Sequence, residues 1–191
     1  MPLPESTART EVHLRRIEMR GYRRDDGLYE IDGRVVDTKS HALHLPDDGR
    51  ALPPGQPIHD MWVRLVVDEF LVVRDVVAVT DASPFAVCRE AVAPMRAIIG
   101  ERIRPGWSMM VKARLGGAVG CTHLMELLLP MATAAYQTLS SVRLARPDVT
   151  DATGRPVKID SCYAYAKERD LVRVRWPAFH RGAGHPETPL P

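Results

Sequence analysis

The sequence predicts an α+β fold in which an antiparallel sheet of about four strands, arranged as two hairpins, is covered on one face by three or four helices. Apolar and polar residues alternate with a period of two in four early segments, and the spacing becomes helical after residue 83. The 191 residues, 45% of them apolar, suffice for one buried core. We therefore expect a single domain over residues 10–177, with disordered ends at 1–9 and 178–191.

The first hairpin is predicted from residues 11–20 and 28–38, with Asp26-Gly27 marking the turn. Five arginines fall within ten residues of this hairpin: Arg15, Arg16, Arg20, Arg23 and Arg24. They either protect an exposed edge strand from aggregation or form a subsite for an anion. In the second case Arg15, Arg20 and Arg23 bind the substrate.

A second hairpin is predicted from residues 58–68 and 70–80, after a loop at 39–56 that is either a lid or disordered. The alternation places His59 on the apolar, inward face. Asp60 then points to the opposite face, unless a bulge at the start of the strand re-aims it.

Helices are predicted at 84–93, 95–99 and 105–115, followed by a long apolar helix that begins at Cys121, ends near Arg143 and is kinked at Pro130. Near the end of the chain, residues 157–166 and 171–176 favour a short hairpin containing Cys162, although helix is an alternative. His180 and His185 lie in a Gly-rich tail, where we expect solvated side chains.

The start of the long helix is the most informative stretch for function. Cys121 and His123 lie where backbone N–H groups are unpaired and the helix dipole favours an anion, so the thiolate of Cys121 should form readily. The two residues can share a ligand only if the helix begins at or just after Cys121. The alternative is a small buried cysteine beside a capping histidine.

Potential metal ligands also occur at the ends of other predicted elements. His59 and Asp60 enter the third strand, and Cys88 follows the fourth. If these ends meet Cys121 and His123 at one edge of the sheet, their N, S and O donors suit zinc or iron.

Two resemblances add to this interpretation. The run from Ile58 to Asp68, then Cys88, then Cys121 beside a histidine, resembles the iron–sulfur scaffold proteins NifU (N-terminal domain) and IscU over residues 57–145. This resemblance implies that His59, Cys88 and Cys121 occupy the places of the three scaffold cysteines. The motifs GYRRDDG, HDM and GCTHL also resemble a bacterial family filed as a domain of unknown function.

Composition excludes some functions. The 26 basic and 24 acidic residues argue against a general nucleic-acid binder, and no apolar run reaches the roughly 18 residues that span a membrane. Three irregularly spaced cysteines do not form a disulfide framework, and the chain does not start like a signal peptide, so we expect a cytoplasmic protein.

The leading hypothesis is a zinc or ferrous enzyme, a hydrolase or lyase that acts on a small anionic metabolite. Its metal ligands are His59, Cys121 and His123, with Cys88 or Asp60 as the fourth, and Glu126 orients a ligand or a bound water. Asp60 and Glu126 are thus the candidate catalytic groups. The alternatives are a metal-binding or iron–sulfur scaffold without catalysis, and a closed structural site or no metal at all.

Overall fold

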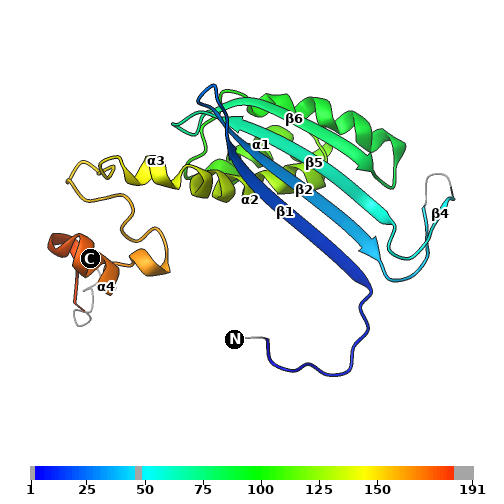
Figure 1. Cartoon of the computed structure of the whole chain (residues 1–191), viewed down its shortest axis with the longest axis horizontal. Coiled ribbons are helices and arrows are strands. Elements are labelled where there is room, and N and C mark those ends of the chain that lie inside the picture. Colours follow the sequence, from blue (N-terminus) through cyan, green and yellow to red (C-terminus); the bar gives the residue numbers. More distant parts are fainter. Residues whose placement is uncertain (1–2, 46–48, 183–191) are drawn as a thin grey trace, which may run out of the picture. The chain divides into compact units, whose positions relative to one another are not determined.

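The main sheet has four long antiparallel strands in the order β1-β2-β5-β6 (Figure 1). The computed structural model describes residues 3–45 and 49–182. The strands are β1 (His13–Arg23), β2 (Tyr29–Lys39), β5 (Pro57–Val67) and β6 (Val73–Ala82). Sequential strands joined by hairpins become neighbours in the sheet, as the two alternating segment pairs predicted. The α+β class and the four-stranded antiparallel sheet are therefore confirmed.

The loop predicted at 39–56 contains a small ribbon. Strands β3 (Leu43–His44) and β4 (Ala51–Leu52) pair with each other in a separate two-stranded sheet. Within this loop, Leu45 is buried. The described part of the loop therefore has a regular fold of its own.

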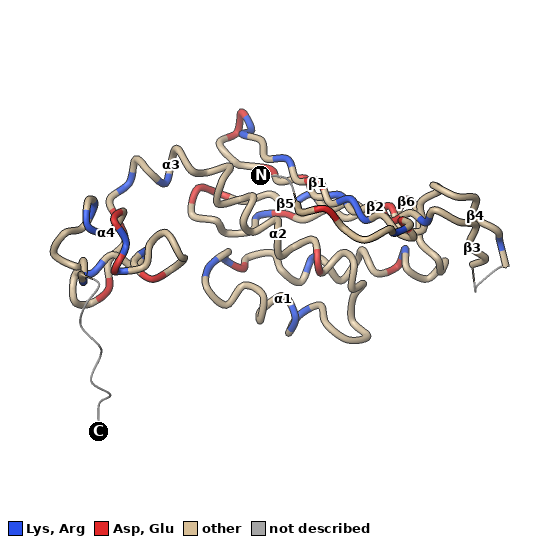
Figure 2. The backbone as a smooth tube through the Cα atoms, turned by 90° about the horizontal axis from the view of Figure 1, so that it is seen from below, with Lys and Arg blue, Asp and Glu red and all other residues tan. Residues whose placement is uncertain are grey.

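The helices cover one face of the main sheet (Figure 2). That face carries the odd-numbered residues of β2 and β5, where apolar side chains such as Ile31, Met61 and Leu65 are fully buried. The helices preceding the C-terminal part are the 3₁₀ helices η1 (Ala86–Ile98) and η2 (Gly117–Val119) and the α-helices α1 (Trp107–Leu115) and α2 (Thr122–Thr138). In the described part of the chain, no helix is long and apolar enough to cross a membrane.

Helix α2 is the main partner of the sheet and approaches it closely at two glycines. A Cβ on Gly33 would lie 2.9 Å from Met131 Sδ, and one on Gly21 would lie 1.8 Å from Thr138 Oγ1. The absence of a side chain at these two positions lets the helix pack against β1 and β2. Because protein interiors are close-packed, a larger residue at either glycine would force the helix and the strand apart.

The helical region differs from the prediction in two places. The segment expected as two helices is one run of 3₁₀ helix, η1, with Pro94 inside it. Proline lacks the N–H that α-helical bonding needs at that position, which is consistent with 3₁₀ winding in place of an α-helix. Helix α2 ends at Thr138, and a short helix α3 (Ser140–Leu144) follows.

The chain divides into two compact units, Met1–Val142 and Arg143–Pro191. The second unit contains η3 (Tyr163–Tyr165), α4 (Asp170–Arg175) and η4 (Pro177–Phe179). The predicted terminal hairpin is therefore wrong, and the helical alternative holds for part of it. The expectation of one domain over 10–177 stays a prediction. His185 lies outside the described residues.

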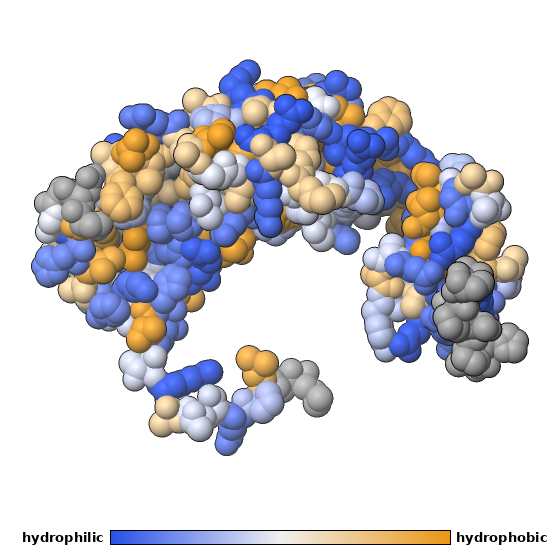
Figure 3. Space-filling view, turned by 180° about the vertical axis from the view of Figure 1, so that it is seen from behind, coloured by the Kyte–Doolittle hydropathy of each residue, from blue (hydrophilic) through white to orange (hydrophobic). Residues whose placement is uncertain are grey.

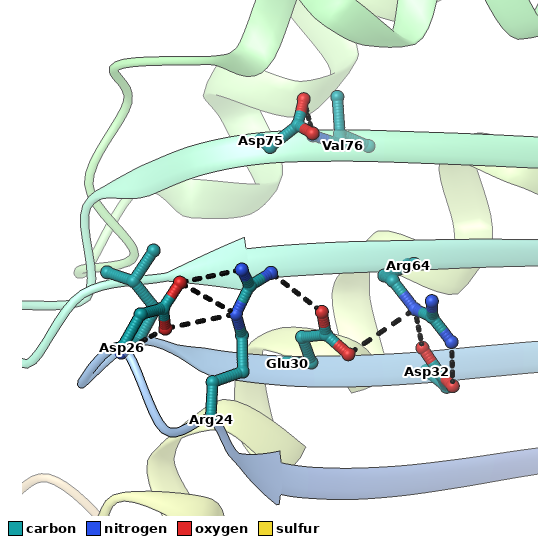
Figure 4. A network of polar contacts seen from close by, with 8 residues as sticks. Arg24, Asp26, Glu30, Asp32, Arg64, Asp75 and Val76 are labelled. Carbon is teal, nitrogen blue, oxygen red and sulfur yellow. Dashed lines mark hydrogen bonds and ion pairs between the residues drawn. The ribbon is translucent and has the colours of Figure 1, made fainter.

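The even-numbered residues of β2 and β5 lie on the other face, which carries cross-strand ion pairs. Arg64 bonds to Asp32 and lies 3.6 Å from Glu30, while Arg24 bonds to Asp26 and Glu30 (Figure 4). A shallow hollow of about 260 Å³ on this face is lined by residues including Trp62, Val77 and Val79. Figure 3 shows the opposite side of the molecule from that in Figure 1, where hydrophilic and apolar side chains are mixed.

Candidate metal centre

A row of polar side chains crosses three strands on the helix-covered face. Arg15 of β1 pairs in register with Asp37 of β2, and Asp37 pairs with His59 of β5. Residues that are directly opposite on adjacent antiparallel strands lie on the same face, close enough for their side chains to interact. The period-two prediction that His59 faces inward agrees with this register.

Asp37 is the centre of this row. Its carboxylate accepts hydrogen bonds from His13 Nε2 (2.9 Å), from Arg15 Nε (2.8 Å) and NH2 (2.9 Å), and from His59 Nδ1 (3.0 Å). The residue is only 2% exposed. An ionised carboxylate can only accept, so the His59 nitrogen that faces it carries a proton. The other ring nitrogen of a neutral His59, Nε2, then keeps its lone pair available to a metal.

The charge of Asp37 is stabilised despite its burial. Burial on its own raises the pKa of Asp37, but the hydrogen bonds from Arg15 and His13 and the charge of Arg15 outweigh it, so that the pKa lies well below its ordinary value. The carboxylate is therefore ionised at neutral pH. A buried charge of this kind is tolerated because it is fully hydrogen-bonded.

The start of helix α2 places a thiol, Cys121, and a second imidazole, His123, next to the polar row of Arg15, Asp37 and His59. Cys121 is the N-cap residue, so the helix begins directly after it, as a shared ligand set requires. The rings of His59 and His123 lie 3.8 Å apart between centroids, at an interplanar angle of 33°. The Cys121 sulfur is 3.9 Å from His123 Nδ1 and 3.9 Å from the sulfur of Met61.

The pKa values of His59 and Cys121 both lie below their ordinary values. Burial lowers the pKa of His59, and the neighbouring His123 lowers it further, against the opposing effect of Asp37. Burial raises the pKa of Cys121, but His123 and the backbone N–H groups of Leu124 and His123 lower it more, so the net shift is downward. Neutral imidazole and thiolate are the forms that bind metals.

Three of these side chains could hold a metal ion together. Asp37, His59 and His123 each offer one ligand atom, and these atoms lie within 4.8 Å of one another. A tetrahedral site with bonds of about 2.0–2.3 Å needs ligand atoms roughly 3.3–3.7 Å apart, a separation within the 4.8 Å limit of this group. Because four donors already occupy the oxygens of Asp37, we assign its carboxylate to orienting His59, a common role for carboxylates next to metal-bound histidines.

Some of the residues predicted for the site lie elsewhere. The carboxylate of Asp60 bonds to Arg34 at 2.8 and 2.6 Å, and the Arg34 guanidinium stacks 4.5 Å from the ring centre of Trp62. Asp60 is thus held on the face opposite to His59, and the bulge after it does not re-aim its side chain toward the cluster. Cys88 lies in η1, and among the described residues the converging group of ligand atoms includes neither Cys88 nor Cys121. Cys121 is nevertheless next to the group, because its sulfur lies 3.9 Å from His123 Nδ1.

The predicted substrate-binding arginines also separate. Arg15 is in the polar row and its NH1 lies 3.6 Å from Glu126. Arg20 pairs with Glu18 on the exposed surface of β1. Arg23 is the last residue of β1, eight positions along the strand from Arg15. The structure therefore brings only Arg15 of these three next to the cluster.

Glu126 lies one turn after His123 on α2, with a half-exposed side chain near Arg15. Asp37 and His13, in contrast, were missed by sequence reasoning. The available signal was the period of two in β2, which places Asp37 in line with the buried Ile31 and Val35.

Comparisons with known proteins give a family but no function. A family model described as "Protein of unknown function (DUF2889)" matches residues 13–137. The matched segment contains the four strands of the main sheet, helix α2 up to Gln137 and all the residues of the candidate metal centre. No curated protein and no solved structure matches the chain, so the resemblance to NifU and IscU gains no support.

Proposed function

Because the chain belongs to the DUF2889 family, whose function is unknown, we propose its function from the candidate metal centre: a zinc- or iron-dependent enzyme of the hydrolase or lyase class. The convergence of the ligand atoms of Asp37, His59 and His123 within 4.8 Å carries this proposal. His59 and His123 would bind the ion, with Cys121 as the third ligand. Asp37 would hold the His59 ring in its ligating orientation.

Three protein ligands leave a fourth position for water, which is the arrangement of catalytic rather than structural zinc sites. A bound metal would lower the pKa of that water toward about 7. Glu126, whose side chain is half exposed one turn along α2, would accept a proton from this water. Of the three arginines predicted to bind a substrate anion, only Arg15 lies next to the candidate metal centre. Arg15 already contacts the carboxylates of Asp37 and Glu126.

This engagement of Arg15 favours a second candidate, a metal-binding scaffold without catalysis. A guanidinium that holds two carboxylates has less capacity to bind a substrate anion. A scaffold needs the ligands but no substrate subsite. The same residues would then bind zinc, or iron with sulfide, for transfer to a partner.

Metal content tests the shared part of both candidates. Protein purified without oxygen should contain about one zinc or iron per chain, measured by plasma mass spectrometry. His59→Ala and His123→Ala should lose most of it, while His44→Ala on β3 should retain it. Asp37→Asn should weaken metal affinity by roughly 10- to 100-fold, as expected for a residue that orients a ligand. Equal metal content in His44→Ala and His123→Ala would rule out this site.

Turnover then separates enzyme from scaffold. Metal-loaded protein should hydrolyse at least one member of a panel of aryl phosphate and carboxylic ester substrates, lose this activity with a chelator and regain it with zinc or ferrous ion. Glu126→Gln should reduce turnover with unchanged metal content. Stoichiometric metal without any turnover, or iron accompanied by sulfide, would instead support the scaffold.

A further inference from the structure

Strand β1 is the outer strand of the main sheet on the side away from β6 (Figure 1). All 11 of its residues, His13 to Arg23, pair with β2. In the described part of the chain, no strand pairs with its other edge, hereafter the β1 edge. The backbone N–H and C=O groups along the β1 edge are therefore able to pair with an added strand.

An apolar row on the helix-covered face ends without cover at the β1 edge. Ile17 of β1 lies opposite Val35 of β2, and Val35 lies opposite Met61 of β5. Val35 and Met61 are 3% and 0% exposed, whereas Ile17 is 53% exposed. An apolar side chain directly opposite Ile17 on an added strand would continue the row and remove Ile17 from water.

The charge of β1 indicates what such a strand carries on the open face of the sheet. Strand β1 contains four arginines and one glutamate. Arg15 is bonded to Asp37, and Arg20 is bonded to Glu18. The exposed side chain of Arg16, in contrast, has no ion pair or hydrogen bond to any residue that the structure describes. A carboxylate opposite Arg16 would be its counter-charge.

We propose that the β1 edge binds, by strand addition, an extended segment of a partner protein in which acidic and apolar residues alternate. Successive residues of a strand face opposite sides of a sheet. A segment with this period places its carboxylates beside Arg16 on the open face and its apolar side chains beside Ile17 on the covered face. Backbone hydrogen bonds then supply affinity, and the two sets of side chains supply specificity.

A second copy of β1 fits this edge less well than an acidic segment does. Pairing two β1 strands brings the arginines of one copy against those of the other. Like charges that lie directly opposite each other destabilise a strand pair. The net charge of β1 therefore favours a partner of opposite charge.

Fluorescence anisotropy with a labelled peptide that alternates glutamate and valine tests the proposal. This peptide should bind, and the same peptide with lysine in place of glutamate should not, because its charge is reversed. A third peptide has the glutamates and the valines in two separate blocks, so its charge is unchanged but the alternation is lost. Its affinity should be at least about fivefold lower. Hydrogen exchange of the β1 amides should slow when the alternating peptide binds.

Two variants test the two faces of the β1 edge. Arg16→Glu should weaken binding of the alternating peptide at least about tenfold, because an attractive pair becomes a repulsive one. Ile17→Thr should weaken it about threefold, because an apolar contact is lost. Threonine keeps a β-branched side chain at an exposed position, so this variant should fold normally.

The matched control is Arg89→Glu, which makes the same charge change at an exposed position of η1. Helix η1 packs against β6, at the other edge of the sheet. Peptide binding by this variant should stay within about twofold of the wild type, because screening limits the reach of an exposed charge. His123→Ala should also bind normally, which separates the β1 edge from the candidate metal centre.

Three results would overturn the proposal. Equal losses in Arg16→Glu and Arg89→Glu would show that only overall charge matters. Equal binding of the alternating and block peptides, with unchanged exchange of the β1 amides, would show charge attraction without strand addition. Wild-type protein that sediments as a dimer, and as a monomer after Ile17→Thr, would assign the β1 edge to a second copy of the chain.

Discussion

The two faces of the main sheet carry the same side-chain pair in two different settings. On the helix-covered face, Arg15 bonds to Asp37 across β1 and β2 at 2.8 and 2.9 Å. On the open face, Arg64 bonds to Asp32 across β5 and β2 at the same two distances. The side chain of Asp37 is 3% exposed and that of Asp32 is 17% exposed. Geometry alone does not distinguish the two pairs.

The surroundings of Asp37 and Asp32 do distinguish the two pairs. Asp37 also holds two histidines, one of which stacks on His123 at the start of α2. The additional contacts of the open-face pair are to other charged groups at the surface, such as Glu30 (Figure 4). A cross-strand ion pair therefore becomes part of a candidate site when a helix start supplies ligands next to it. An exposed pair contributes little to stability, whereas a buried one is costly to break.

The largest expected difference is in stability. Asp37→Asn puts an amide donor where four donors converge and leaves Arg15 with Glu126 as its remaining counter-charge, so the free energy of unfolding should fall by roughly 3 kcal/mol. Asp32→Asn should cost less than about 1 kcal/mol. Urea denaturation of the two variants measures both values, and similar losses would show that the two faces are equivalent.

Acid unfolding sharpens the same contrast. The pKa of Asp37 is lowered by folding, so its contribution to stability is complete above the unfolded-state value of about 4 and is lost as the pH falls toward the folded value. Between those values the wild type should lose up to about 1.4 kcal/mol per pH unit through this group.

Asp32→Asn should keep this pH dependence and Asp37→Asn should lack it, as followed by denaturation at pH 2.5 to 5. An unchanged slope in Asp37→Asn would mean that other carboxylates dominate acid unfolding.

Thiol reactivity tests the helix start at the edge of the covered face. In metal-free protein, alkylation of Cys121 by iodoacetamide should be half-maximal at a lower pH than alkylation of a free cysteine peptide, because burial raises the pKa of Cys121 less than His123 and two backbone N–H groups lower it. Peptide mass spectrometry follows this residue individually. His123→Ala should move the midpoint upward, and no movement would remove His123 as the cause.

Sequence reasoning predicted the sheet because the alternation at β2 and β5 is a local pattern that the buried face enforces. It also placed His59 inward and started the long helix at Cys121 for local reasons. It missed Asp37 because the partners of this residue come from β1 and β5, and only the strand register brings them together. The predicted terminal hairpin failed because short apolar runs such as 171–176 do not distinguish strand from helix.

The smallest effect is expected from Asp60, which the sequence placed among the catalytic candidates. Its carboxylate is held by Arg34 on the open face, and Arg34 also stacks on Trp62. Asp60→Asn should therefore leave metal content and any turnover within about twofold of the wild type, because the Asp60 carboxylate lies on the face of the sheet opposite to His59. Metal analysis and activity assays beside Asp37→Asn provide the measurement. If Asp60→Asn lost as much metal as is expected for Asp37→Asn, the functional site would have to include residues on both faces of the sheet.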